Sequence, residues 1–558
     1  MTATNLQNSR AQQMSLLWRL KMEIEKAPAG STPGIQYIHF NALRTDKTYR
    51  AEIIEQALQS QVEEIRALAK EVLSIEHLVE APSAADPSGS HPAGSAGDNR
   101  ASGQIPPGNL HRRETSRRLS GLTTVSFALL VMVLLVGGYF FATDPRLTRQ
   151  ITNIEVQGSI LQDTVWRAGS TYRLNGLVFV EGNATLSIEP GTRILGEPGS
   201  ALIVTRDARL NARGTVEQPI IFTSAKPVGQ RARGDWGGVV LLGNAPVNTS
   251  VGYIEGIDRA DPRGAYGGTN DTDSCGVLTY VRIEFAGNEI SKDNELNGLT
   301  LGGCGDGTIL RFVQIHMGLD DGIEFFGGSA NLSHIVITRA GDDGLDWDRG
   351  WTGSGQFIVI QQDDQAGDSC IEADNQKKDP NATPRSAPSL SNVTLVGGGD
   401  PMKAQRGMVL RLGTGADLRN LLIAGFSLDA IDVRDEATVA QTRTGALQAR
   451  ALVFTEAVSG RVFEQESGEE DDDGGFDEEK FFLSRESGSA FIPDQVLSGD
   501  VHDLTKPDFV PVYTESLMKI HAPIIQGEFW DESANYVGAI RPGSRNTWLD
   551  GWTAFASN

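Results

Sequence analysis

The stretch DGIEFFGGSANLSHIVITRAGDDGLDWDRG, residues 321–350, contains one unit of a repeat and the start of the next. Its apolar position Ile323 recurs as Leu345 after 22 residues, and Val313 recurs as Ile335 at the same interval. Each unit has short β-branched strands broken by Gly, Asn and Asp, with no helical pattern between them. Such a unit cannot bury its apolar face alone and has to stack on copies of itself. The pattern predicts a right-handed parallel β-helix with one turn of the coil per repeat.

Related segments continue both series, with insertions between some of them. They are NGLTLGG around Leu299, SCIEADN around Ile371, RGMVLRLG around Val409 and DAIDVRD around Ile431 in one series, and GQFIVI around Ile358, LSNVTLV around Val393 and LRNLLI around Leu421 in the other. Residues 184–214 alternate apolar and polar side chains with frequent Gly, which is typical of early turns of the same coil. We therefore expect the β-helix to occupy residues 151–558, with a solvated acidic loop, or a calcium-binding one, at about 464–479.

The segment ahead of the repeats has a different composition. Residues 122–142 hold 21 residues without a charge, long enough to cross a bilayer, so a transmembrane helix is expected at 119–143. Residues 80–118 are rich in Pro, Ala, Ser and Gly and predict a flexible linker. Apolar residues at helical spacing predict a small, mainly helical module at 1–79. The expected fold class is thus all-β, a parallel β-helix preceded by one transmembrane helix and a helical module.

Charge gives the expected orientation and partners. Arg112, Arg113, Arg117 and Arg118 precede the apolar segment, which predicts a bacterial inner-membrane protein with its N-terminus in the cytoplasm and its β-helix in the periplasm. The module at 1–79 would then meet a cytoplasmic partner, and the β-helix a glycan or an envelope protein. The formal net charge of −23 argues against a nucleic-acid partner, because phosphate binding needs a basic face.

The chain has three cysteines, all beyond the apolar segment. Cys275 and Cys304 lie in Gly-rich turns about one turn of the coil apart. Adjacent turns are ~4.8 Å apart, within the Cα separation that a disulfide tolerates. We expect these two to be bridged and Cys370 to pack inside the coil as a free thiol.

Carboxylates repeat in register with the coil. Asp-Asp pairs precede the strands of successive repeats, and further acids lie on those strands. Stacking would place them in columns, where close carboxylates must bind a cation, pair with a base or hold a proton. The candidate metal ligands are Asp320, Asp321, Glu324, Asp342, Asp343, Asp346, Asp348, Glu372 and Asp374. Asp363 and Asp364 are expected to supply the third Asp-Asp pair.

We call these stacked carboxylates the ladder. Three interpretations of the ladder remain open. In the first it is turn chemistry alone, with Asp capping its own backbone and Gly taking a positive φ. In the second it binds Ca²⁺ through hard oxygen ligands, bracing the coil or bridging to an acidic glycan. In the third, paired carboxylates act as acid and base on a polysaccharide, or calcium with a basic residue supports β-elimination.

Aromatic and basic residues near the ladder are candidate ligand-binding residues, because exposed rings beside carboxylates suit sugars. They are Trp347, Trp351, Arg349, Lys377 and Arg385. Trp548 and Trp552, near the end of the chain, are expected to cover the last turn of the coil.

Segments from 234 onwards resemble a bacterial family of right-handed β-helix surface proteins and lipoproteins. The resemblance is seen in GDWGGVVLLGNAPVN (234–248), DSCGVLTYVRIEFAG (273–287), DNELNGLTLGGCGDGT (293–308) and YVGAIRPGSRNTWLDGWTAF (536–555), and it covers roughly 170–558. It implies export and a β-helix, and no established activity. The chain departs from the lipoprotein members because it has no N-terminal lipobox cysteine. The expected function is non-catalytic binding or scaffolding in the envelope; the alternative is a polysaccharide lyase or glycoside hydrolase.

Overall fold

The structure, a computed structural model of the chain, describes residues 16–17, 19–20, 23–24, 47–79, 152–291, 294–458, 461–463 and 472–556. The chain divides into two compact units, Met1–Thr148 and Arg149–Asn558, each described here by itself. In the first unit, helices α3 (Lys47–Ala57) and α4 (Glu63–Val79) pack through a small apolar core. The predicted linker at 80–118 lies outside the described residues, and so does the first part, 464–471, of the acidic loop predicted at about 464–479.

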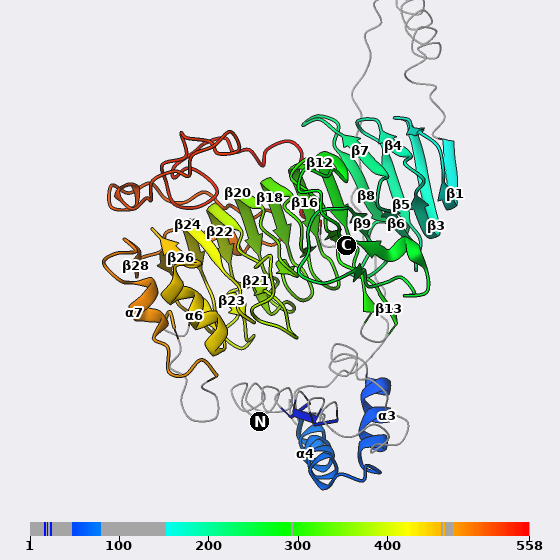
Figure 1. The fold of residues 1–558 in the computed structure, drawn as a ribbon. Coiled ribbons are helices and arrows are strands. Elements are labelled where there is room, and N and C mark those ends of the chain that lie inside the picture. The colour runs from blue at the N-terminus through cyan, green and yellow to red at the C-terminus, as the bar shows by residue number, and fades with distance from the viewer. Residues whose placement is uncertain are drawn as a thin grey trace, which may run out of the picture. The chain divides into compact units, whose positions relative to one another are not determined.

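The second unit is a parallel β-helix with three faces, along which strands of successive turns pair in parallel (Figure 1). Strands of the first face are β2 (Thr164–Trp166), β4 (Thr185–Ile188), β7 (Arg209–Arg213) and β26 (Leu447–Arg450). Those of the second are β5 (Arg193–Gly196), β8 (Ile220–Ser224), β27 (Val453–Thr455) and β28 (Ala490–Ile492). Those of the third are β6 (Ala201–Val204), β9 (Val239–Leu242), β15 (Leu299–Gly302), β17 (Ile323–Phe326), β19 (Leu345–Asp348), β21 (Ser369–Asp374), β23 (Arg406–Arg411) and β25 (Ile431–Val433).

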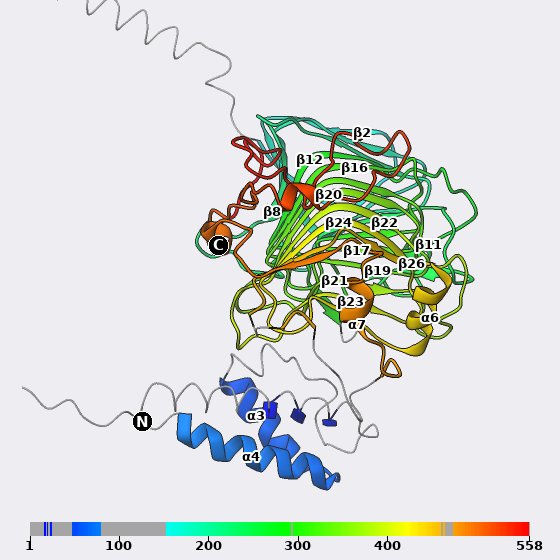
Figure 2. The ribbon, with the colours of Figure 1, turned by 90° about the vertical axis from the view of Figure 1, so that its left-hand side faces the viewer.

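Longer strands bend across two faces. β12 (Gly276–Glu284), β16 (Ile309–His316), β18 (Asn331–Thr338), β20 (Ser354–Gln361), β22 (Ser389–Val396) and β24 (Ala416–Ala424) each run from the first face to the second. β12 shows this directly, because its first half pairs with β7 and its second half with β8. β1 (Thr152–Ile160) and β3 (Ser170–Val180) span the second and third faces, since β3 pairs with both β5 and β6. Successive turns lie one behind another in Figure 2.

One residue at each bend adopts a left-handed backbone conformation. The residues are Tyr280, Phe312, His334, Phe357, Asn392, Asn420 and Ala451, with φ between +50° and +62°. A positive φ turns the strand sharply at the cost of a conformation that most residues avoid. Because the bends stack, these side chains form a column along the edge between the first and second faces.

Short elements lie outside the coil. β10 (Gly252–Tyr253) pairs with β11 (Ala265–Tyr266), and β13 (Glu289–Ser291) pairs with β14 (Asn294–Glu295), both antiparallel. Helix α6 (Glu436–Thr444) and helix α7 (Glu478–Phe482) lie near the C-terminal end of the coil. Single 3-10 turns are η1 (Pro262–Gly264), η3 (Gly499–His502) and η4 (Leu517–Lys519).

The C-terminal segment, residues 494–556, runs back along the outside of the coil toward β12 (Figure 1, red). Its apolar side chains pack on Val336, Val359 and Leu422 of the second face. Trp552 meets the rings of Tyr280 and Phe312 edge-on, at centroid distances of 5.7 and 6.1 Å. This corrects the expectation that Trp548 and Trp552 cover the last turn, because the segment covers the side of the coil.

The cysteine predictions are confirmed. Cys275 and Cys304 form a disulfide with a Cα–Cα distance of 5.7 Å, and Cys370 is a buried free thiol. Cys275 lies directly before β12, and Cys304 lies between β15 and β16, so the bridge joins segments that lead into neighbouring strands of the first face.

The predicted fold class is corrected in one part. The parallel β-helix and a helical unit are present, but no helix among the described residues is long and apolar enough to cross a membrane. The transmembrane helix is therefore not supported as part of the fold. Residues 119–143, on which it was predicted, lie outside the described part of the chain.

Candidate cation site on the third face

Parallel pairing on the third face places three acidic residues opposite one another. Glu324 pairs with Asp346 and Asp346 with Glu372, while their neighbours Ile323 and Leu345 point into the apolar core. Side chains alternate along a strand, so a residue next to an inward one faces outward. Adjacent strands lie ~4.8 Å apart, which forces these carboxylates into one outward column.

The loops that precede these strands carry a second column of carboxylates. Each accepts a hydrogen bond from a backbone N–H group in the next turn of the coil. The Oδ1 of Asp321 accepts the backbone N–H of Asp343 at 2.9 Å, and the Oδ1 of Asp343 accepts that of Ser369 at 2.7 Å. This differs from the first of the three interpretations, in which each Asp would cap its own turn. These two aspartates bond successive turns together.

The expectation that Asp363 and Asp364 supply the third pair is wrong. Backbone pairing sets Asp368 next to Asp342, so Asp368 and Ser369 occupy that place in the column. Asp363 instead accepts hydrogen bonds from Arg233 at 2.7 Å and Arg339 at 2.5 Å. Burial alone would raise the pKa of Asp363, but the two guanidinium groups outweigh it and hold that pKa below its usual range.

Two groups of three carboxylates could each hold a metal ion. One is Asp320, Asp321 and Asp342, and the other is Asp321, Glu324 and Asp346; within each, the candidate ligand oxygens lie within 4.8 Å of one another. Asp321 belongs to both groups and could bridge them. These five sequence-predicted acids are therefore brought together, whereas Asp343 and Asp348 belong to neither group.

A buried oxygen in the second group lacks a partner. The Oδ1 of Asp346 is shielded from solvent and makes no hydrogen bond. A buried polar atom without a partner costs about 1–3 kcal/mol, more if charged, so it marks a place where a ligand would be stabilising. Nearby, the side-chain amide of Asn297 donates to Glu324 at 2.5 Å, while its own Oδ1 is also buried without a partner.

Two acids from the loops add to this cluster, and the repeat pattern did not indicate them. Glu255, between β10 and β11, raises the pKa of Glu324 by repulsion, and Glu295 in β14 does the same to Asp320. Neither belongs to the 22-residue period. The only signal was the acidic character of the insertions that contain them.

The carboxyl groups at the centre of the ladder are held toward the protonated form. Burial, followed by repulsion from neighbouring acids, raises the pKa of each well above its ordinary value. This applies to Asp320, Asp321, Glu324, Asp343 and Asp346. Either protons or a cation must offset their mutual repulsion.

Arginines compensate only the outer part of the ladder. Arg411 forms ion pairs with Glu372 and with Asp374, the latter at 2.7 Å, and Arg349 pairs with Asp348 at 3.3 Å. Burial nevertheless raises the pKa of Glu372 to about 7 and that of Asp348 to about 6. Among the described residues no arginine or lysine forms an ion pair with Asp321, Glu324 or Asp346. The centre of the ladder is thus the part without an ion-paired base among the described residues.

Arg349 is also bonded to a residue of β11. Its guanidinium donates to the hydroxyl of Tyr266 at 2.9 Å and lies 5.1 Å from the ring centre of Phe326. Burial raises the pKa of the Tyr266 hydroxyl, so it remains protonated at neutral pH. Tyr266 therefore fixes Arg349 beside Asp348 at one side of the ladder.

The other predicted ligand-binding residues are placed differently. Trp347 and Trp351 are fully buried, and Trp351 stacks on Phe325 at a centroid distance of 4.2 Å. Their rings are part of the core and offer no surface to a sugar. Lys377 is exposed on a loop, and the guanidinium of Arg385 donates to the carbonyls of Pro380 and Gly413.

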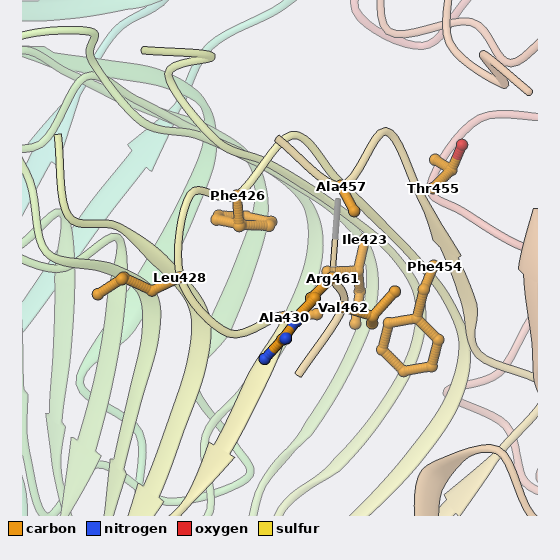
Figure 3. Close-up of a pocket in the computed structure, with 9 residues that line it drawn as sticks. All are labelled: Ile423, Phe426, Leu428, Ala430, Phe454, Thr455, Ala457, Arg461 and Val462. Carbon is orange, nitrogen blue, oxygen red and sulfur yellow. The ribbon is translucent and has the colours of Figure 1, made fainter. Parts of the chain in front are cut away.

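Two hollows in the described part of the β-helix lie away from the ladder. One lies near the C-terminal end of the coil, between Phe426, Phe454 and Val462 (Figure 3), and its volume of about 10 Å³ has room for one water at most. The other, about 490 Å³, lies on the first face. The ladder lies on the third face, with Asp321 and Asp343 largely buried.

A comparison with known families agrees with this architecture. Residues 158–485 match the model of the pectate-lyase-like β-helix domain, which is more than half of the chain. The chain belongs to this family, a class defined by stacked parallel strands. No curated protein and no solved structure matches the chain.

Proposed function

We propose that the β-helix is an exported, non-catalytic binding domain that holds calcium in its carboxylate ladder and binds acidic glycans through that ion. The unpartnered Oδ1 of Asp346, grouped with Asp321 and Glu324, is the observation that carries the proposal. Membership of a pectate-lyase-like family supports a carbohydrate-related role. The disulfide supports export to an oxidising compartment.

Calcium suits this site better than magnesium does. It takes six to eight oxygen ligands in flexible geometry, whereas magnesium demands a near-ideal octahedron and keeps its waters. A group of carboxylates can supply several of those oxygens and leave others to a bound uronate. Asp321, shared by the two groups, would couple two neighbouring ions.

Thermal unfolding of the full chain tests the site directly. After treatment with EDTA, added calcium should raise Tm, because a ligand that binds only the folded state stabilises it. Asp346→Asn should abolish the increase, whereas Asp494→Asn, an exposed aspartate outside the ladder, should keep it. An unchanged Tm with calcium in the wild-type chain would refute the cation site.

A second experiment tests the glycan. Hexagalacturonate should bind in calcium and lose at least tenfold in affinity in EDTA, a loss of about 1.4 kcal/mol or more. If binding is the same in both conditions, the ion does not hold the glycan.

An enzymatic role is the second candidate, and one observation favours it. Glu372 and Asp348, with pKa values of about 7 and about 6, are poised to exchange protons near neutral pH. Incubation with polygalacturonate in calcium, followed by absorbance of unsaturated products and by reducing-end assay, separates the two roles. Turnover that is lost in Glu372→Gln would establish an enzyme.

A further inference from the structure

The larger hollow is a groove on the first face, separate from the ladder. Its volume of about 490 Å³ falls within the roughly 300–1,000 Å³ typical of ligand sites. The floor consists of outward residues of β16, β18 and β20, and the opposite wall is residues 528–531 of the C-terminal segment. Three turns at ~4.8 Å give it a length of about 10 Å along the coil.

The floor offers hydrogen-bonding groups that are mostly uncharged. Parallel register aligns Ile309 with Asn331, and Ser333 with Gln356. The Oδ1 of Asn331 accepts the backbone N–H of Ser354 at 2.8 Å, and its amide nitrogen has no partner among the described residues. Amides and hydroxyls both donate and accept, which suits a ligand rich in hydroxyl groups.

His334 at the edge of the groove is also uncharged. Its Nδ1 lies 2.8 Å from the Oγ of Ser333, and burial lowers its pKa to about 4. At neutral pH the imidazole can therefore donate through one nitrogen and accept through the other. It adds polarity to the groove without adding charge.

Apolar surface completes the groove. Ile309 is 45% exposed in the floor, which is unusual for an isoleucine on a strand of this coil. Phe529, half-buried in the wall, packs edge-on against Trp530 at 4.9 Å. Such surface can cover the C–H faces of sugar rings. The backbone N–H of Asp531 donates to the Oε1 of Gln356 at 2.8 Å and ties the wall to the floor.

The charge of the groove disfavours anionic ligands among those rich in hydroxyl groups. Asp306, Glu528 and Asp531 line the groove, against one guanidinium, that of Arg311. The guanidinium lies 5.3 Å from the ring centre of Phe312, with no ion pair to any described residue. Three carboxylates and one guanidinium give a negative groove, which repels polyanions such as polyuronates and nucleic acids.

We propose that this groove binds a short neutral oligosaccharide, independently of calcium and of the ladder. The ligand lies along the coil, its hydroxyls bonded to Asn331 and Ser333 and its ring faces against Ile309 and Phe529. The two sites then recognise different sugars on different faces of one coil. This inference does not depend on the proposed cation site.

Saturation-transfer NMR and calorimetry on the full chain in EDTA test the proposal. The probes are cellohexaose, xylohexaose, mannohexaose and maltohexaose, with hexagalacturonate as the anionic comparison. We expect one or more of the neutral hexaoses to bind and hexagalacturonate not to bind. Binding of none of the four, or of hexagalacturonate alone, would overturn the proposal.

Two substitutions locate the binding. Ile309→Trp places an indole in the groove and should weaken the neutral ligand at least tenfold, about 1.4 kcal/mol. Val165→Trp adds the same side chain at another exposed strand position, 48% exposed on β2, and should leave affinity unchanged. Equal affinity in Ile309→Trp and wild type, with both chains folded by circular dichroism, would place the ligand elsewhere. Asp346→Asn should still bind the neutral hexaose, which would show that this binding does not involve the ladder.

Discussion

The aspartates ahead of the third-face strands link turns of the coil through side chains as well as through the backbone. Asp321 and Asp343 each accept a backbone N–H from the following turn, and both are buried. A buried carboxylate in this position stabilises the stack only while its charge is balanced, because desolvation disfavours the charged form. The same residues that hold the coil together therefore make it sensitive to protons and cations.

Glu372 should make stability depend on pH. Its pKa is about 7 in the folded chain against an ordinary value of 4.5, so the folded state binds this proton more tightly than the unfolded state does. The free energy of unfolding should then fall as pH rises from about 4.5 to about 7, by an amount on the order of 3 kcal/mol. Glu372→Gln should flatten this fall.

Urea unfolding in EDTA, at several pH values across that window, measures the effect. Glu515→Gln, at an exposed position, is the control and should keep the wild-type dependence. An identical slope in Glu372→Gln and wild type would show that this carboxyl does not titrate with folding.

Gly344, in the second Asp-Asp-Gly unit, is required for close approach between turns and not for a positive φ. A Cβ at this position would lie 2.4 Å from Ile360 and 2.6 Å from the backbone oxygen of Cys370. Gly344→Ala should destabilise the chain by about 3 kcal/mol, as overpacking against backbone does. Gly499→Ala, whose Cβ would meet only an atom of Gln495 at 4.0 Å, should stay within about 0.5 kcal/mol of wild type in the same denaturant titration. Similar effects of the two substitutions would argue against crowding.

Among the elements, the C-terminal segment is fastened to the coil by amides at the bends. The amide nitrogen of Asn392 donates to the carbonyls of Ala534 and Tyr536, at 3.1 and 2.6 Å. The Oδ1 of Asn420 accepts the backbone N–H of Ala522 at 2.7 Å. Asparagine suits these positions for two reasons. It tolerates a positive φ, and its side chain can form hydrogen bonds with the C-terminal segment.

Asn392→Gly should remove the side-chain hydrogen bonds to the C-terminal segment while keeping the backbone bend. Glycine accepts the φ of +55° at this position, so the substitution removes the side chain without straining the backbone. Hydrogen exchange of residues 534–540 should become faster, and stability should fall by about 1–3 kcal/mol. Unchanged exchange there, measured by mass spectrometry, would show that apolar packing alone holds the segment.

The repeating elements could be predicted from sequence, and the elements between them could not. The apolar alternation around Ile323 and Leu345 fixes both strand position and register, since a one-residue slip would expose the core side chains. The acids beside them followed from that register. Glu255 and Glu295 lie on insertions without a period, so nothing local in the sequence indicates where they approach the coil. The burial of Trp351 depends on its stacking with Phe325 of the neighbouring turn. The residues around Trp351 in the sequence do not indicate this contact.

As a whole, the β-helix has two dissimilar ends. At the C-terminal end Phe454, Phe463 and Phe482 pack together, and α7 contributes the last of these. At the other end β1 pairs only with β3 among the described residues, and Ile154 and Leu161 are exposed by 36% and 63%. Each turn contacts mainly its neighbours, so an end turn has half the support of an inner one. Stability should accordingly rise from β1 toward the middle of the coil.

A matched pair of core truncations tests this gradient. Leu174 in β3 and Leu390 in β22 are both fully buried, and Leu→Ala in a core typically costs 2–5 kcal/mol. Leu174→Ala should speed hydrogen exchange in β1–β5 and leave β18–β24 protected, because the first turns can open without the rest. Leu390→Ala, in an inner turn with paired strands on both sides, should speed exchange on both sides of β22, since turns there open only when their neighbours do. Equal loss of protection along the coil in both variants would mean that the β-helix unfolds as one cooperative unit, without the end-to-centre gradient that its nearest-neighbour contacts predict.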